Sequence, residues 1–78
     1  MTKALVLINT KMGEEKEVLK KVKEIGGVKK AYIYYGVYDI IAEVETDDNQ
    51  KLGKLVTDCI RRIPNVEATI TLLIVGNQ

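Results

Sequence analysis

The chain has 78 residues, with twelve Lys and Arg against eleven Asp and Glu, so its formal net charge is +1 at pH 7. A chain of this size hides only about 60% of the surface that its unfolded form exposes, so self-association would stabilise it. No stretch approaches the roughly 20 apolar residues of a membrane span, and the amino end lacks the layout of a signal peptide. We therefore expect one domain over residues 1–78, located in the cytoplasm, with no membrane partner.

The residue types that are missing exclude several kinds of chemistry. The chain has no His, Trp or Phe and a single Cys, Cys59. Zinc sites need several thiolate or imidazole ligands, and a nucleophile of the Ser-His or Cys-His kind needs an imidazole. We therefore expect no metal, no cofactor and no catalytic residue.

The first third of the chain predicts a strand followed by a helix. Residues 4–8 form a continuous apolar run rich in branched side chains, which is typical of a strand in the middle of a sheet. From residue 13 to residue 25 the spacing becomes helical, with acidic residues near the start and lysines toward the end. The expected apolar stripe of this helix is Val18, Leu19, Val22 and Ile25. Gly26 and Gly27 then end it.

Residues 28–35 and 38–45 are rich in β-branched and aromatic side chains and predict a β-hairpin. Only Gly36 and Val37 separate them, so we expect a tight turn with a positive φ at Gly36. All four tyrosines of the chain lie on this hairpin. In its second strand, the side chains expected to face the core are Ile40, Ala42 and Val44.

The second half predicts another helix and a last strand. Asp47, with Gln50 three residues later, has the form of a capping box. The apolar stripe that follows is Leu52, Leu55, Val56, Cys59, Ile60 and Ile63, which favours a buried position for Cys59. Pro64 and Asn65 end the helix. The final strand has one firmly apolar face, formed by Val66, Ala68, Ile70, Leu72 and Ile74.

This order, β-α-β-β-α-β, predicts the α+β arrangement called ferredoxin-like, a four-stranded antiparallel sheet with two helices on one face. The first and third strands should be central. The other face of the sheet is then uncovered, and we expect it to carry part of the first strand's apolar run with Ile41, Leu73 and Val75. An uncovered apolar patch on so small a domain favours dimerisation through the sheets.

The fold does not give the function, and several functions of this fold leave marks that are missing here. An RNA-recognition domain stacks bases on aromatic side chains of its central strands, but the third strand carries Asp39, Glu43 and Glu45, which repel phosphate. Asp39 and Glu43 are about 13 Å apart along an extended strand, too far for a catalytic pair. We therefore expect no direct contact with nucleic acid.

The turn from Tyr35 to Asp39 has two interpretations. It can be a plain hairpin turn, with glycine for its φ and tyrosines for their strand propensity. It also places a closely approachable backbone, an amphipathic ring and a carboxylate within five residues. Such groups suit a zwitterion, because amide N–H groups can bind a carboxylate and Asp39 an ammonium group.

Three short motifs accompany the element order. They are the turn Gly36-Val37-Tyr38-Asp39 followed by two isoleucines, the passage Ile63-Pro64-Asn65-Val66 and the strand Thr69-Ile70-Thr71. Together they resemble the effector-binding domain of the Lrp/AsnC family of regulators, also called the RAM domain, and the turn is the most specific of the three. The resemblance covers nearly the whole chain. Full-length regulators also carry an amino-terminal helix-turn-helix domain, whereas here the first strand begins at Lys3, so we expect a stand-alone version without inherited DNA binding.

In that family the domains form homodimers through their sheets, the dimers assemble into rings, commonly octamers, and amino acids bind between dimers. The resemblance implies a ligand site at Gly36, Val37, Tyr38 and Asp39. Gly36 and Val37 would present backbone to the ligand, Tyr38 would line the pocket, and Asp39 would contact the amino group or fix the loop. Thr69 and Thr71 match strand positions near the family's pocket.

The leading hypothesis is a non-enzymatic module that binds a free amino acid, oligomerises, and modulates transcription by co-assembly with full-length Lrp/AsnC regulators or acts by sensing alone. The alternative is a small dimeric ferredoxin-like enzyme of the monooxygenase type. That enzyme would need a roomy pocket between helices and sheet inside each subunit. A third possibility, a purely structural assembly partner, predicts rings without a ligand response.

Overall fold

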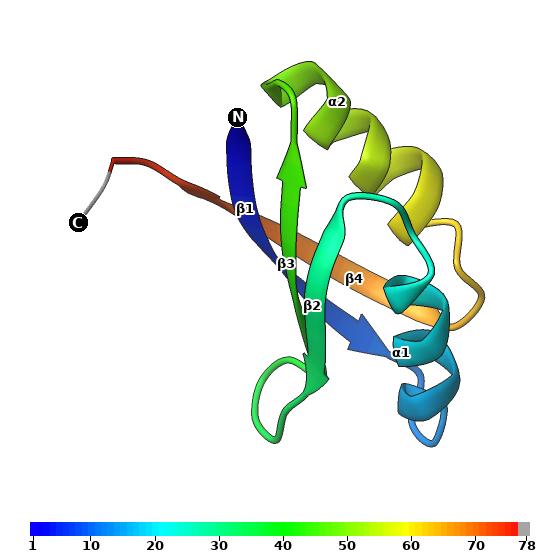
Figure 1. Ribbon diagram of the computed structural model, residues 1–78. Helices are drawn as coiled ribbons and strands as arrows, with labels where there is room; N and C mark the ends of the chain where they lie inside the picture. The colour runs from blue at the N-terminus through cyan, green and yellow to red at the C-terminus, as the bar shows by residue number, and fades with distance from the viewer. Residues whose placement is uncertain (77–78) are drawn as a thin grey trace.

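The computed structural model describes residues 1–76 and shows one antiparallel sheet with its helices on one face (Figure 1). The strands are β1 (Thr2–Thr10), β2 (Val28–Ile33), β3 (Ile40–Thr46) and β4 (Val66–Ile74). The helices are α1 (Glu15–Lys23) and α2 (Asn49–Lys54), and α2 continues as a π-helical segment, η1 (Leu55–Ile60). The strand order is β2-β3-β1-β4, so β1 and β3 are central. The ferredoxin-like fold and the central strands are thus confirmed.

The register of the two central strands places the core. Val6 lies opposite Ala42 and Ile8 opposite Ile40, and all four side chains are fully buried beneath the helices. Strand side chains alternate between faces, so Leu5 and Leu7 lie on the opposite, open face. The other buried side chains of the core are Ala4, Val18, Val22, Ala31, Val44, Leu52, Leu55, Val56 and Ile60. Strand β4 contributes Val66, which is partly buried against this core.

The predicted faces of β4 are wrong. Leu73 lies opposite the buried Ala4, so it is on the helix side, and Leu72 lies opposite Leu5 on the open face. The open face therefore carries Ile70, Leu72 and Ile74 in place of Leu73, and Val75 lies beyond the end of the strand. A shift of one residue exchanges the two faces of a strand, and both faces of this strand carry apolar side chains.

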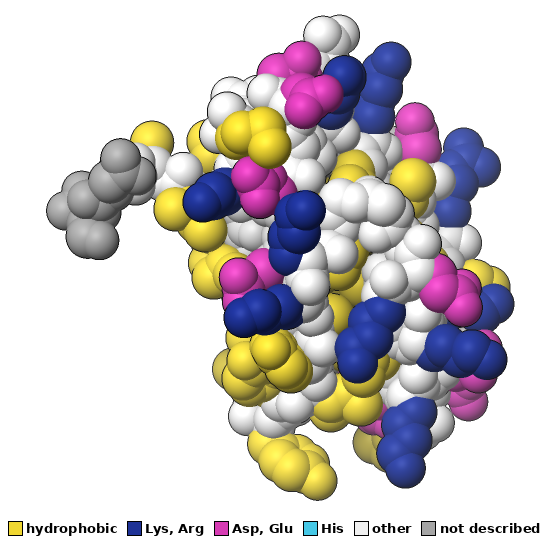
Figure 2. Space-filling view, in the orientation of Figure 1, with side chains coloured by type: hydrophobic (Ala, Val, Ile, Leu, Met, Phe, Trp, Pro, Cys, Tyr) yellow, Lys and Arg dark blue, Asp and Glu magenta, His cyan; other side chains and the backbone are white. Residues whose placement is uncertain are grey.

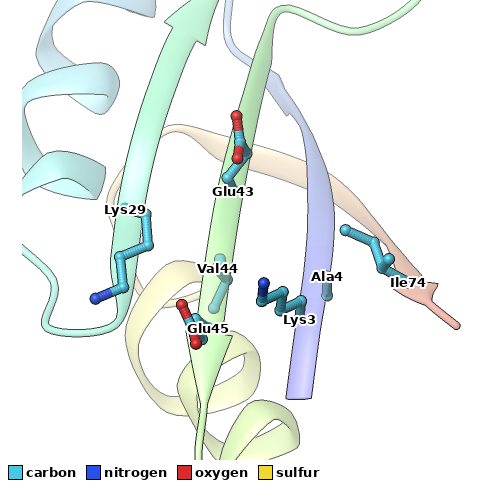
Figure 3. Close-up of a pocket in the computed structure, with 7 residues that line it drawn as sticks. All are labelled: Lys3, Ala4, Lys29, Glu43, Val44, Glu45 and Ile74. Carbon is cyan, nitrogen blue, oxygen red and sulfur yellow. The ribbon is translucent and has the colours of Figure 1, made fainter. Parts of the chain in front are cut away.

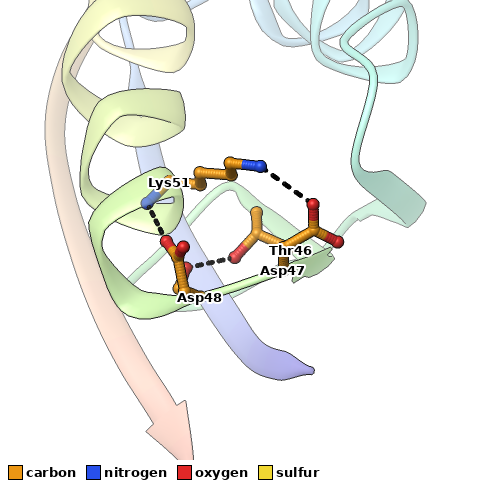
Figure 4. A network of polar contacts seen from close by, with 4 residues as sticks. All are labelled: Thr46, Asp47, Asp48 and Lys51. Atoms are coloured by element: carbon orange, nitrogen blue, oxygen red, sulfur yellow. Dashed lines mark hydrogen bonds and ion pairs between the residues drawn. The ribbon is translucent and has the colours of Figure 1, made fainter.

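Helix α2 begins one residue later than the capping box predicts (Figure 4). Asp48, in place of Asp47, is the N-cap, and its Oδ1 accepts a hydrogen bond of 2.8 Å from the backbone N–H of Lys51. The Asp47 carboxylate instead pairs with the Lys51 ammonium group at 2.9 Å. That hydrogen bond and the positive charge of Lys51 lower the pKa of Asp47, and the pKa of Lys51 is raised in return.

The π-helical segment η1 explains why the prediction of a buried Cys59 is wrong. Its turn is wider than an α-helical turn, as the hydrogen bond from the N–H of Arg61 to the carbonyl of Val56 shows. Ile60 is fully buried, whereas Cys59 is exposed. The apolar spacing predicts a buried Cys59 only for α-helical geometry, and the extra width of this turn moves Cys59 off the buried stripe.

Candidate functional site

The connection between β2 and β3 is longer than the tight turn that the sequence predicts. Strand β2 ends at Ile33 and β3 begins at Ile40, so six residues, 34–39, form the loop. The backbone N–H of Tyr34 donates a hydrogen bond of 2.8 Å to the carbonyl of Asp39, which closes the loop. Gly36 has a φ of +147°, within the region that favours glycine. The tyrosines give this segment strand propensity, but residues 35–38 lie outside the sheet ladder.

Asp39 fixes this loop to the end of β1. Its backbone N–H donates to the carbonyl of Ile8 at 3.0 Å, and its Oδ2 accepts from the backbone N–H of Thr10 at 2.8 Å. The carboxylate therefore takes the place of a backbone carbonyl and extends the β1–β3 ladder by one bond. Thr10 is buried and Asp39 half-buried. Of the two roles expected for Asp39, fixing the loop is the one that these contacts show.

A hollow of about 260 Å³ lies between this loop and the start of α1. Its lining residues are Glu15, Lys16, Ile33, Tyr34, Tyr35 and Asp39. It thus combines two carboxylates, one ammonium group and two phenol rings. The Glu15 carboxylate also accepts a long hydrogen bond of 3.4 Å from the N–H of Gly13. The volume is below the roughly 300–1,000 Å³ of sites for drug-sized ligands, so it suits a small metabolite.

Of the residues lining this hollow, the sequence predicted only Asp39 as a site residue. Glu15 and Lys16 are far from the loop along the chain, and the folding of α1 against β2 brings them beside it. Acidic residues at the start of a helix are explained by the helix macrodipole alone, so the sequence held no separate signal for them. Tyr34 and Tyr35 carried a signal in the clustering of the tyrosines.

The other predicted site residues lie outside this hollow. Gly36 and Val37 are exposed at the tip of the loop, and Tyr38 is half-buried. Thr69 lies opposite Ile8 and Thr71 opposite Val6, so both threonines are on the helix side of the edge strand β4. Because β1 separates β4 from β3, the threonines are about 10 Å from the strand that follows the loop. One chain therefore does not bring the loop and the threonines into one pocket.

The open face of the sheet holds a smaller hollow of about 110 Å³ (Figure 3). Its lining includes the charged side chains of Lys3, Lys29, Glu43 and Glu45. Within residues 1–76, no three side chains among Cys, Asp and Glu are grouped so that they could hold a metal ion. Over the same residues, no helix has the length and apolar character needed to cross a bilayer.

The sequence profile of the Lrp/AsnC ligand binding domain matches residues 3–77. The chain belongs to this family. Among curated relatives, the HTH-type transcriptional regulator PF0250 of Pyrococcus furiosus is 32% identical over 59 residues, which is 76% of this chain and 39% of that protein. This Lrp/AsnC domain thus spans about two fifths of the length of the curated relatives that it matches. Their names are those of transcriptional regulators rather than enzymes.

Several solved structures share the fold of this Lrp/AsnC domain. TTHA0845 from Thermus thermophilus is 31% identical with a TM-score of 0.96, and the match covers 100% of this chain and 98% of that one. PHS023 from Pyrococcus horikoshii is 38% identical with a TM-score of 0.90, covering 99% and 93%. The regulator NMB0573 of Neisseria meningitidis, solved as a complex with L-Met, is 13% identical with a TM-score of 0.86, over 96% of this chain and 50% of that one, and shares the fold.

Proposed function

We propose that this Lrp/AsnC domain binds a free amino acid at the hollow beside the β2–β3 loop and modulates transcription through its assembly state. The observation that carries the proposal is the grouping of Asp39, Glu15 and Lys16 around one small hollow. An amino acid in solution carries one ammonium group and one carboxylate, and the hollow offers groups of opposite charge to both. Family membership and the L-Met complex of a protein with this fold support the same ligand class.

The α-ammonium group of the ligand would donate to Asp39 or Glu15, and its α-carboxylate would accept from Lys16. An ionised carboxylate has about four lone-pair positions on two oxygens. Asp39 can therefore keep its bond to the N–H of Thr10 and accept from a ligand at the same time. Hydrogen bonds between ionised groups are about twice as strong as neutral ones, which suits recognition of a zwitterion. Tyr34 and Tyr35 would contact the ligand side chain.

Assembly would complete the site. Gly36, Val37 and Tyr38 lie at the loop outside the hollow, and Thr69 and Thr71 lie on the far edge strand of the same sheet. A neighbouring chain could bring its threonines to this loop, which a single chain does not do. We propose homodimers formed through the open faces of the sheets, which then form rings, with an octamer as the expected size. Full-length Lrp/AsnC regulators are the proposed partners for co-assembly, without direct nucleic-acid contact by this domain.

The alternative of a monooxygenase-type enzyme is less well supported. It needs a roomy pocket between the helices and the sheet. That layer is filled by apolar side chains from α1, α2, η1 and the central strands, and Val6, Ile8 and Ile40 are fully buried there. The hollow beside the loop lies at the start of α1, outside this layer.

A thermal-shift screen of the twenty amino acids tests ligand binding. A ligand at a hundred times its dissociation constant stabilises the folded state by about 2.7 kcal/mol, which raises the Tm measurably. We expect at least one amino acid to raise the Tm, and we expect Lys16→Gln to reduce the shift. Lys20→Gln is the matched control, since Lys20 is exposed one turn further along α1 and outside the hollow. If none of the twenty changes the Tm, the proposal of amino-acid binding is wrong.

A further inference from the structure

A compact group of charged side chains interrupts the open face of the sheet. In the ladder, Lys3 lies opposite Glu45 and Lys30 opposite Glu43. Figure 3 shows Lys3, Glu43 and Glu45 on neighbouring strands, with Lys29 beside them on β2. We call this group, Lys3, Lys29, Lys30, Glu43 and Glu45, the charged zone. In Figure 2, basic and acidic side chains interleave over the strands, with apolar side chains beside them.

An irregularity in β2 adds a lysine to this zone. Val28 lies opposite Val44 and Ala31 opposite Ala42, so both face the helices although they are three residues apart. Regular alternation would put residues three apart on opposite faces, so one residue between them is extra. Lys30 is therefore on the open face, opposite Glu43, rather than directed at the helix layer. Lys29 and Lys30 are both exposed.

The charges of this zone have no ion-pair partner among residues 1–76. Across residues 1–76, the one pair within 4.0 Å joins Lys51 to Asp47 at the start of α2. Around the zone the open face is apolar, and its half-exposed side chains include Tyr32, Ile70, Leu72 and Ile74, each between 43% and 48% exposed. Leu5, Leu7 and Ile41 lie on the same face between them. Any molecule that covers the apolar part also removes water from the charges beside it.

The charged zone restricts which molecule can cover the open face of the sheet. A charge that is removed from water without an opposite partner strongly destabilises an interface. An apolar partner surface would leave five charges unpaired, and a surface of one sign would repel either the lysines or the glutamates. A second copy of this chain brings three lysines and two glutamates. Two-fold symmetry makes each Lys–Glu contact occur twice.

We infer that the charged zone selects a second copy of this chain as the occupant of the open face, by placing the lysines of each copy against the glutamates of the other. The inference rests on the proposed assembly through the open faces and adds which residues determine the choice of partner. The apolar side chains supply most of the contact area. Because like charges that face each other across an interface are unfavourable, chains without this pattern are rejected.

Charge reversal on the full chain tests the inference. One variant carries Glu43→Lys and Glu45→Lys, and the other carries Lys3→Glu and Lys30→Glu. Sedimentation measures self-association of each variant alone and of the two variants mixed. We expect each variant alone to associate about tenfold more weakly than the unaltered chain or worse, and the mixture to form a heterodimer with restored affinity. Restored affinity in the mixture would show that both variants fold. Added salt should weaken this heterodimer, because salt screens the attraction between opposite charges.

The matched control carries Lys20→Glu and Lys23→Glu, which reverses two exposed charges of α1 on the other side of the molecule. We expect this control to dimerise like the unaltered chain. If the unaltered chain dimerises and both zone variants dimerise equally well alone, the charged zone does not select the partner and only this inference is wrong. If the mixture stays dissociated while each variant has native circular dichroism, the inference is also wrong. If the unaltered chain is a monomer at all concentrations, the proposed assembly itself is wrong.

Discussion

Replacing Asp39 tests its structural role at the end of β1. The Oδ2 of Asp39 accepts a 2.8 Å hydrogen bond from the N–H of Thr10, a residue that is 6% exposed. Hydrogen bonds to charged groups contribute about 1.5–3 kcal/mol, and a buried donor left without a partner costs about 1–3 kcal/mol. Asp39→Ala should therefore destabilise the domain by about 2 kcal/mol. In a domain of 60–100 residues, this lowers the Tm by roughly 8–16 °C.

Asp39→Asn keeps an acceptor oxygen for Thr10 and loses only the charge. We expect it to cost about 1 kcal/mol, because neutral hydrogen bonds contribute about 0.5–1.5 kcal/mol. Urea unfolding followed by circular dichroism measures both free energies. Asp58→Ala, an exposed carboxylate on η1, is the control and should change stability by less than about 0.5 kcal/mol. Equal stability of the Ala and Asn variants would refute the role of the Thr10 bond.

Substitutions at three positions test the backbone of the fold. Gly53→Ala should stabilise the domain by about 0.5–1 kcal/mol, because Gly53 lies within α2 and an added Cβ meets nothing within 4 Å; urea unfolding would contradict this by showing a loss. Gly27→Ala should destabilise the domain by about 1–3 kcal/mol, since the φ of Gly27 is +99° and the new Cβ would lie 2.8 Å from Leu55 Cδ1. An unchanged Tm would contradict this, because it would show that the Leu55 side chain moves away without cost. Asn65 has a φ of +75°, and its side-chain amide donates a hydrogen bond to the Glu14 carboxylate. Asn65→Ala should therefore lower the free energy of unfolding by about 1–2 kcal/mol, and Asn65→Gly should lower it less. A larger loss for the glycine variant in calorimetry would contradict the left-handed conformation.

The sequence was sufficient to predict those parts of the fold in which the spacing of apolar residues fits only one buried position. The apolar run of β1 predicted a central strand. Helical spacing predicted a stripe of which Val18 and Val22 are buried, while Leu19 and Ile25 are partly buried. The sequence was insufficient for β4, where Leu72 and Leu73 suit both faces and the pairing with β1 alone decides which faces outward. It also missed the widened turn of η1, which depends on backbone hydrogen bonding rather than on side-chain pattern.

The candidate site divides in the same way. Asp39 could be predicted because a carboxylate next to a glycine turn has a recognisable chemistry. Glu15 and Lys16 could not, because their place beside the loop follows from the packing of α1 against β2. The contribution of Thr69 and Thr71 stays a prediction, since it depends on a second chain.

The most direct test of amino-acid binding at the loop is a titration of the isotope-labelled chain followed by backbone amide NMR. The best amino acid from the thermal screen is added stepwise to the unaltered protein. We predict saturable shifts of the amides of Glu15, Lys16 and residues 34–39, with those of α2 unchanged. Saturable shifts confined to other parts of the chain, or no shifts at a concentration that raises the Tm, would contradict the placement of the ligand at this hollow.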